Sequence, residues 1–219
     1  MSRLFAALYD PFMARLEARD LQRRRVRLLA DEHGRVLELG AGTGANLAAR
    51  ARSASAARAL ILVEPHPGMA ARLRRRLREQ PATIPRALVA ARAEALPLAD
   101  ASIDTAVLTL LLCSVNDPGL VLTELRRVLK PDGRLLVLEH VRDPRPWRAR
   151  LQRLVEPLWR PLADGCRLTR DTRAALEAAG FDTAGLRDER LSVGPVFLRP
   201  IIVGLARPRT ALAEASPAG

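Results

Sequence analysis

Aromatic residues and cysteines are scarce in this 219-residue chain. Aromatic side chains make up 3% of it, so a buried core has to be built from leucine, valine and alanine. The two cysteines, Cys113 and Cys166, cannot supply a disulfide framework for a chain of this length, which fits a reducing cytosol. No apolar run is long enough to cross a bilayer, and no signal peptide is visible at the N-terminus. We therefore expect a cytoplasmic protein with one domain and a substantial core.

Lysine is scarcer still, since it occurs only at Lys130, and arginine therefore supplies the formal net charge of +12. A basic chain can attract nucleic acid or anionic lipid, but these arginines are not interleaved with aromatic residues, which disfavours nucleic acid. Residues 1–30 are predicted to form basic amphipathic helices. Their polar face is either solvated or lies on an anionic membrane, which would make the protein peripheral to that membrane. The face contains Arg15, Arg19, Arg23, Arg24, Arg25 and Arg27.

Residues 31–207 alternate between strand-like and helix-like patterns and are predicted to form a single domain. The predicted strands cover 35–39, 59–64, 86–91, 103–109, 134–140, 181–190 and 195–206. The predicted helices cover 45–52, 67–79, 117–129 and 169–179, the last with Thr169 as its N-cap. This order predicts an α/β fold that is Rossmann-like and doubly wound, with a mostly parallel seven-stranded sheet. The last two strands are expected to form a hairpin, which makes the final strand antiparallel.

Two segments depart from this regularity. An insert at 143–168 contains both tryptophans and four of the prolines, Pro144, Pro146, Pro157 and Pro161. Long inserts after the carboxyl end of a strand often carry substrate contacts, so we predict that three of its side chains line a substrate pocket: Trp147, Trp159 and Cys166. Ordinary packing within the insert is the alternative role for them. The tail 208–219 is rich in alanine, proline and serine and is predicted to be disordered.

The strongest functional signal is E-L-G-A-G-T-G at residues 38–44. A predicted strand leads into Gly40, Gly42 and Gly44, where the missing Cβ lets the backbone turn sharply and lets a ligand approach it. The helix that follows would point its N-terminal N–H groups to the same place. The spacing G-x-G-x-G differs from the G-x-G-x-x-G of dinucleotide-binding folds. The pattern predicts a nucleotide-like ligand here, with a tight turn that binds nothing as the alternative.

Further motifs fall at the ends of the next predicted strands. Glu64 follows the strand at 59–64, and a carboxylate there can accept two hydrogen bonds from the vicinal hydroxyls of a ribose. Met69 is placed to cover an adenine face. The block A-E-x-L-P at 93–97 can offer backbone amides to the edge of the adenine ring. Thr109 ends the strand at 103–109, beside the glycine loop.

These motifs, together with L-R-R-V-L-K-P-D-G at 125–133, resemble the class I S-adenosylmethionine-dependent methyltransferases. Many members of that family carry an aspartate where this chain has Arg92, so the group that contacts the adenine stays open between the Ala93 amide and the Glu94 region. The resemblance implies S-adenosylmethionine as the cofactor, and it implies no metal site. The cofactor-binding residues implied are Glu38, Gly40, Ala41, Gly42, Gly44, Asn46, Glu64, Pro65, His66, Met69, Ala93, Glu94, Thr109 and Leu110.

A narrower resemblance rests on T-L-L-L-C-S-V at 109–115, L-E-H-V at 138–141 and D-G-C-R-L-T-R at 164–170. These segments are similar to the methyltransferase-like thiol methyltransferases, which implies a small-molecule methyl acceptor such as an alkyl thiol. His140, which ends the strand at 134–140, is the candidate catalytic base, and a packed or solvent-facing histidine is the alternative. A phospholipid or quinone methyltransferase at a membrane surface is the second hypothesis. An RNA-binding or RNA-modifying protein is favoured only by the net charge, and a cofactor-binding protein without activity also stays open.

Overall fold

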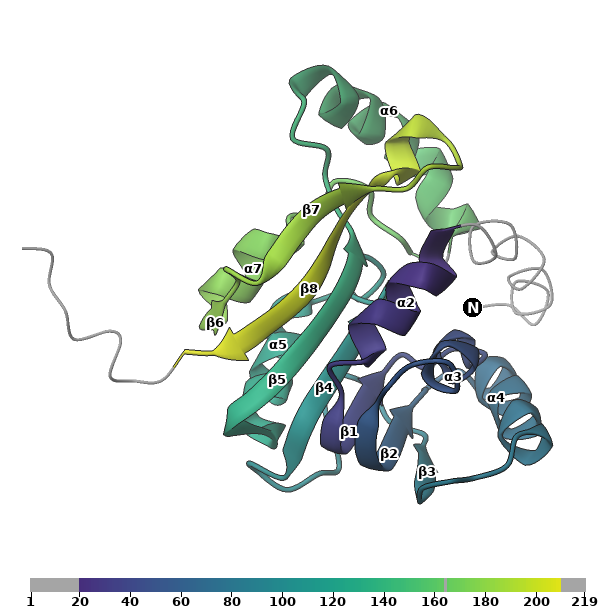
Figure 1. Ribbon diagram of the computed structural model, residues 1–219. Helices are drawn as coiled ribbons and strands as arrows, with labels where there is room; N and C mark the ends of the chain where they lie inside the picture. The colour runs from purple at the N-terminus through teal and green to yellow at the C-terminus, as the bar shows by residue number, and fades with distance from the viewer. Residues whose placement is uncertain (1–19, 164, 210–219) are drawn as a thin grey trace, which may run out of the picture.

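The computed structural model describes residues 20–163 and 165–209 and has one central sheet (Figure 1). The strand order is β3-β2-β1-β4-β5-β8-β6, and β7 pairs with β8. The chain starts in the middle of the sheet, moves to one edge and then builds the other, which confirms the doubly wound arrangement. The strands are β1 (His33–Leu39), β2 (Ala56–Val63), β3 (Arg86–Val89), β4 (Ile103–Thr109), β5 (Leu129–His140), β6 (Phe181–Asp182), β7 (Leu186–Arg190) and β8 (Pro200–Pro208).

The strand pairs from β3 across to β5 are all parallel, and β8 runs antiparallel to both β5 and β7, as predicted. The structure splits the strand predicted at 181–190 into β6 and β7, because the chain turns where the Leu186 amide donates to the Thr183 carbonyl at 2.9 Å. The sheet therefore has eight strands where seven were predicted. In the parallel part, Leu39 is level with both Val63 and Leu108, so β1, β2 and β4 end together.

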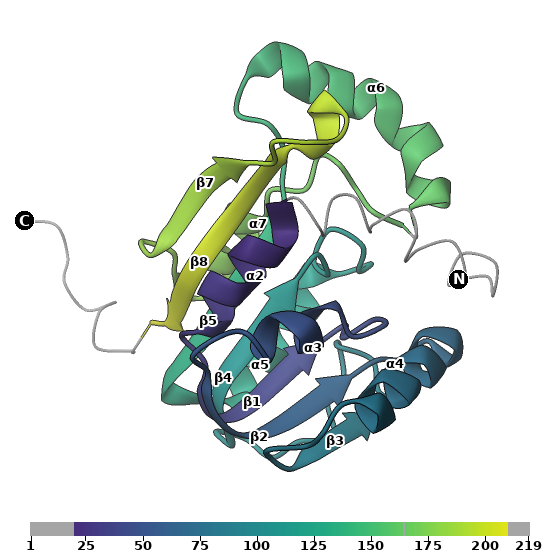
Figure 2. The ribbon, with the colours of Figure 1, turned by 45° about the vertical axis from the view of Figure 1, so that its right-hand side comes forward.

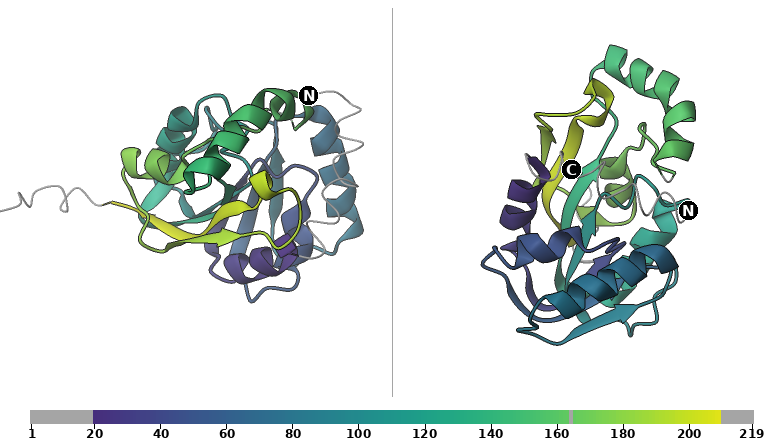
Figure 3. Two further views of the ribbon diagram at one scale, coloured as in Figure 1. Left: turned by 90° about the horizontal axis from the view of Figure 1, so that it is seen from above. Right: turned by 90° about the vertical axis from the view of Figure 1, so that its right-hand side faces the viewer.

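Helices cover both faces of the sheet, as the two views of Figure 3 show. Alternate strand residues point to opposite faces, so Leu37 and Leu39 pack with α5 and α7 while Val36 and Leu60 pack with α2, α3 and α4. Leucine, valine and alanine form most of both clusters, as the scarcity of aromatic residues predicts. The helices are α2 (Gln22–Leu29), α3 (Ala45–Arg50), α4 (Pro67–Glu79), α5 (Pro118–Val128), α6 (Pro146–Leu162) and α7 (Thr172–Ala178), with a short 3₁₀ helix η2 (Val196–Leu198).

Helix α2 is part of the core, and this corrects the prediction for its arginines. Arg25 is buried, and Arg24 is half-buried in ion pairs with Asp20 and Glu189, so neither lies on an exposed basic face. Only Arg23 and Arg27 of the described helix are exposed. The predicted positions of Arg15 and Arg19 lie outside the described residues, and so do residues 210–219 of the tail. The predicted start of the disordered tail at residue 208 was wrong, because Pro208 ends β8.

The N-cap predicted at Thr169 was wrong. Helix α7 begins at Thr172, and the carboxylate of Asp171 caps it by accepting from the Ala174 amide at 3.1 Å. The Thr169 amide and hydroxyl instead donate to Glu156 Oε2, at 2.9 and 2.8 Å. An aspartate two residues further on competes well for the capping position because Asp and Thr are both good caps.

Most of the insert forms helix α6, which lies beyond the end of the sheet where β5 and β7 end and β8 begins (Figure 2). Pro146 takes the first helical position, where proline removes no intrahelical hydrogen bond. Pro157 and Pro161 lie inside the helix on exposed positions, where water can satisfy the carbonyls that lose their partners. None of the described helices is both long and apolar enough to cross a bilayer.

Candidate active site

The glycine loop between β1 and α3 adopts left-handed backbone angles that require its glycines. The φ angles of Gly40, Gly42 and Gly44 are +63°, +56° and +91°. A Cβ at Gly40 would lie 2.6 Å from Leu111, whereas a Cβ at Gly42 would meet nothing closer than the Gly40 carbonyl at 3.9 Å. The loop is therefore tightly packed at Gly40 and open at Gly42. An open backbone at the carboxyl end of β1 is where a nucleotide-like ligand can approach.

Glu64 lies directly beside this loop, one residue past the end of β2. Its Oε2 accepts from the Gly42 amide at 2.8 Å, and its Oε1 accepts from the His66 amide at 2.8 Å. These two bonds orient the Glu64 carboxylate toward the glycine loop. His66 caps α4 by accepting from the buried Met69 amide at 3.2 Å.

A cavity of about 230 Å³ opens at the same edge of the sheet. Four of the predicted cofactor residues line it: Gly40, Pro65, Ala93 and Glu94. No individual role was predicted for the other lining residues, which are Val63, Arg92, Leu111, Ser114, Val115 and Asn116. Arg92, one of these lining residues, pairs with Glu94 at 3.4 Å.

The block A-E-x-L-P is held by two residues of α5. Glu124 accepts from the Leu96 amide at 2.8 Å, while Arg127 donates to the carbonyls of Leu96 and Leu98. Hydrogen bonds from Arg127 lower the pKa of Glu124 to about 2, so the carboxylate stays charged at neutral pH. These contacts fix the backbone that the sequence placed against the adenine.

The end of β4 is strained and is fixed by a buried carboxylate. Leu110 has φ +57°, a left-handed angle that costs a non-glycine residue about 1–2 kcal/mol. Glu139 on β5 accepts from the amides of Leu111 and Leu112, at 2.8 and 3.1 Å, and so holds the turn that follows. Strained backbone of this kind is often found at functional sites, and here the next residue, Leu111, lines the cavity.

Glu139→Gln tests the charge state of this carboxylate. Burial raises the pKa of Glu139 from 4.5 to about 7, although the backbone amides of the turn oppose the shift. The native state consequently loses stability as the pH rises through this range, because only the unfolded chain ionises freely. Glutamine keeps the acceptor oxygen, so the variant should gain about 3 kcal/mol over the wild type between pH 4.5 and 8. Urea unfolding at both pH values measures this gain.

Glu124→Gln is the matched control for that experiment. The pKa of Glu124 is lowered, so its charge stabilises the native state fully once the pH exceeds 4.5, and the glutamine variant should be less stable than the wild type by an amount that stays constant between pH 4.5 and 8. If the free energy of unfolding changed equally with pH in Glu139→Gln and in the wild type, Glu139 would be ionised in the folded protein.

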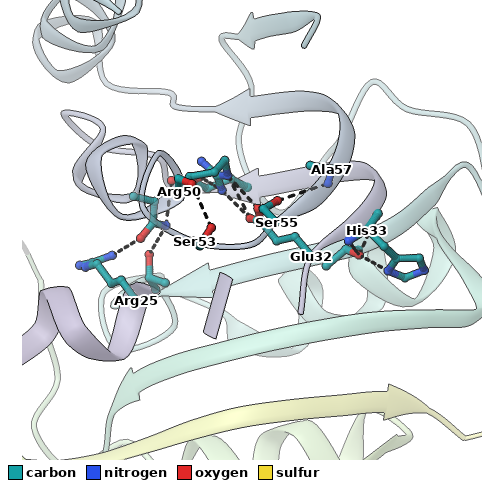
Figure 4. A network of polar contacts seen from close by, with 11 residues as sticks. Arg25, Glu32, His33, Arg50, Ser53, Ser55 and Ala57 are labelled. Atoms are coloured by element: carbon teal, nitrogen blue, oxygen red, sulfur yellow. Dashed lines mark hydrogen bonds and ion pairs between the residues drawn. The ribbon is translucent and has the colours of Figure 1, made fainter. Parts of the chain in front are cut away.

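A buried polar network supports the glycine loop from below (Figure 4). Asn46, in the first turn of α3, donates to Glu38 Oε1 and to the Thr109 hydroxyl, both at 3.0 Å. Its own oxygen accepts from Arg25 Nη1 at 2.5 Å. Arg50 bridges Glu38 and Glu32 at 2.8 and 2.6 Å. Three predicted cofactor contacts, Glu38, Asn46 and Thr109, thus have protein partners and position the loop through them.

Arg25→Met is expected to weaken cofactor binding about tenfold, because it removes the hydrogen bond that fixes Asn46 beneath the loop. Calorimetry with S-adenosylhomocysteine measures the dissociation constant. Arg23→Met, on the exposed side of the same helix, should leave that constant unchanged. Equal constants for the two variants would remove Arg25 from the support of the site.

The structure does not bring His140 into the cavity. Its side chain is buried, and its Nε2 lies 3.0 Å from the Phe197 carbonyl, which has to accept the hydrogen bond. Burial lowers the pKa of His140 to about 4, so the ring is neutral at physiological pH. Gln152 donates to the same carbonyl at 3.0 Å, which identifies His140 as part of the contact between β5, α6 and η2.

The three predicted substrate-pocket residues of the insert separate into two places. Trp159 and Cys166 lie close to each other, and Cys166 also lies beside Cys113, the neighbour of the cavity residue Ser114. The hydrogen bond between the two thiols raises the pKa of Cys113 and lowers that of Cys166. Trp147 lies twelve residues before Trp159, about 18 Å along the helix, and is mostly exposed. None of the three lines the cavity, although Cys166 lies beside Cys113, next to the lining residue Ser114.

The loop, the carboxylate and the open backbone at Gly42 fit S-adenosylmethionine. Comparison with known proteins agrees, because a family model described as a methyltransferase domain matches residues 37–137. A SAM-dependent methyltransferase from Thermotoga maritima, described as a possible histamine N-methyltransferase, has a TM-score of 0.67 at 22% identity, covering 95% of this chain and 97% of that one. At this identity the likeness establishes the fold.

Two curated relatives define the group more narrowly. Human thiol S-methyltransferase TMT1B is 38% identical over 173 residues, which are 78% of this chain and 69% of the relative. The rat protein of the same name is 40% identical over 153 residues, 69% of this chain and 61% of its own length. The chain thus spans about two thirds of these relatives. It belongs to the class I S-adenosylmethionine-dependent methyltransferases, as its motifs predicted. Within that class it resembles the thiol S-methyltransferases TMT1A and TMT1B.

Proposed function

We propose that this chain transfers the methyl group of S-adenosylmethionine to the sulfur of a small thiol. The observation that carries the proposal is the bridge from Glu64 to the Gly42 amide, since it places a carboxylate and an open backbone at one point of the sheet edge. Relatives that are named as thiol S-methyltransferases support the acceptor class. S-adenosylmethionine, when bound, supplies a methyl group that is already activated by its sulfonium charge.

The chain's own residues then have to align the acceptor and exclude water. Gly40, Ala93 and Leu111 line the cavity and are positioned to confine the reacting groups. A thiol reacts as its thiolate, so the rate should depend on how much of the acceptor is ionised. We do not propose His140 as a general base, because its ring lies against Phe197 and is not part of the cavity lining.

Labelled cofactor tests this proposal when it is incubated with small alkyl thiols, a lipid extract, quinones and RNA. We expect label on the thiols, with a rate that rises as the pH approaches the thiol pKa. Label confined to lipid or quinone would favour the second hypothesis, and label confined to RNA would overturn the acceptor class. If S-adenosylhomocysteine neither binds nor shifts the thermal unfolding, the methyltransferase proposal itself fails.

We also propose a peripheral contact with anionic membrane. The N-terminal basic face that suggested this contact has fewer exposed arginines than predicted, because Arg25 is buried.

A further inference from the structure

Helix α6 exposes a stripe of leucines. Leu154, Leu158 and Leu162 are 76%, 75% and 74% exposed, and their spacing of four residues places them along one side of the helix. Trp147, at 57% exposure, lies on the same side of the helix, about two turns before Leu154. These four side chains are most of the large apolar residues that the described part of the chain exposes; the other is Leu120. We call Trp147, Leu154, Leu158 and Leu162 the leucine stripe.

The opposite side of α6 attaches the helix to the domain through polar contacts. Gln152 is fully buried, donates to the Val141 and Phe197 carbonyls and accepts from the Asp143 amide at 2.8 Å. Glu156, one turn later, accepts from Thr169. Trp159 then packs edge-on against Phe197, with ring centroids 5.7 Å apart. The helix therefore turns a hydrogen-bonding side inward and an apolar side outward, the reverse of an ordinary surface helix.

Basic side chains flank the leucine stripe. Arg150, Arg153 and Arg160 are exposed, and at 100° per residue they fall along one margin of the stripe. Glu156 is the only acidic residue of the helix, and it points to the domain. A helix with an apolar side, a basic margin and no exposed acid is suited to the interface of a membrane.

We propose that α6 is the surface by which this protein docks on an anionic bilayer, with the leucine stripe in the interfacial layer and the flanking arginines on lipid phosphates. Charge complementarity selects this occupant. A second copy of the chain would bring an equally basic margin against this one, since a symmetric contact pairs a surface with itself. Residues 1–19 carry three arginines against two carboxylates, so their charge does not complement α6 either.

Docking in this way would bring the cavity lined by Ser114 and Val115 toward the lipid surface. The loop after α6 returns to the cavity wall, where the Arg167 amide donates to the Cys113 carbonyl at 2.8 Å. Figure 3 shows α6 standing apart from the helices that cover the sheet, so a flat surface can reach it without displacing them.

Sedimentation of the full chain with lipid vesicles tests the proposal. Wild-type protein should sediment with vesicles of phosphatidylcholine and phosphatidylglycerol, and much less with phosphatidylcholine alone. The triple variant Leu154→Ser/Leu158→Ser/Leu162→Ser should bind the anionic vesicles at least ~10-fold more weakly, since burying one leucine is worth about that factor. Leu120→Ser, an exposed leucine on α5, should bind as the wild type does. Arg150→Gln/Arg153→Gln should weaken binding more than Arg74→Gln/Arg78→Gln, which removes the same charge from α4.

S-adenosylhomocysteine binding without vesicles reports separately on folding and on the cofactor site, and the triple variant should retain it. Unchanged vesicle binding by the triple variant would overturn the proposal. So would loss of binding in Leu4→Ser/Leu8→Ser alone, which would place the contact in the N-terminal segment. A wild-type dimer that the triple variant converts to a monomer, with no vesicle binding by either, would identify the stripe as an interface between copies.

Discussion

Replacing Glu64 by alanine is expected to weaken S-adenosylhomocysteine binding by about 100-fold or more. The buried carboxylate accepts from the amides of Gly42 and His66, and each hydrogen bond to a charged group is worth about 1.5–3 kcal/mol. The variant loses both of these bonds along with the proposed acceptor for the ribose hydroxyls, and the loop loses its tie to β2. Isothermal titration calorimetry measures the dissociation constant directly.

Glu79→Ala is the matched control for Glu64→Ala, because it removes an exposed carboxylate from the other end of α4. Its dissociation constant should equal that of the wild type. The dissociation constant of Glu64→Gln should lie between those of Glu64→Ala and Glu79→Ala. The amide keeps one acceptor oxygen, but its NH₂ group then faces a backbone N–H. If Glu64→Ala bound as tightly as the control, the ligand would not lie at this edge of the sheet.

Arg50→Met is expected to destabilise the fold by about 3–5 kcal/mol, the largest stability effect that we predict. The guanidinium lies between Glu32 and Glu38, and all three side chains are buried. Methionine fills a similar volume but leaves two buried carboxylates without a cation. Urea unfolding at neutral pH gives the change in the free energy of unfolding.

Two comparisons distinguish loss of charge pairing from loss of packing at Arg50. Arg52→Met, on an exposed position two residues later, should change stability by less than about 0.5 kcal/mol. Arg50→Met/Glu32→Gln/Glu38→Gln should recover much of the loss, because the carboxylates are then neutral. A single variant as stable as Arg52→Met would mean that water reaches the network.

The sequence predicted best those elements whose ends carry a local signal. Helix α4 has the predicted bounds because Pro67 suits the first helical position and no residue before Glu79 breaks the pattern. Strand β4 also matches, since an apolar run begins at Ile103. Strand β5 begins five residues earlier than predicted, at Leu129. Pro131 and Gly133 indicate a turn locally, yet the pairing of Ile103 with Leu129 extends the strand past that irregularity.

The candidate site shows the same division between local and long-range signals. The loop glycines and Glu64 were recognised because each follows a strand directly in sequence. Residues that hold the site from elsewhere, such as Arg127, Glu139 and Arg25, carry no local mark of that role. Arg25 was assigned to a basic face because helical spacing shows which residues share a side, but not whether that side meets a buried amide such as Asn46.

Helix α2 lies ahead of the matched methyltransferase domain, at residues 37–137, and ahead of the boundary at residue 31 that sequence patterns suggest. It nevertheless packs Leu28 and Leu29 into the core and sends Arg25 to the glycine loop. The segment that the family model matches is therefore shorter than the part of the chain that holds the site together. Residues 31–207 transferred into another protein would contain the glycine loop but not Arg25. A chimera would have to be joined before residue 20 to keep the loop and Arg25 together.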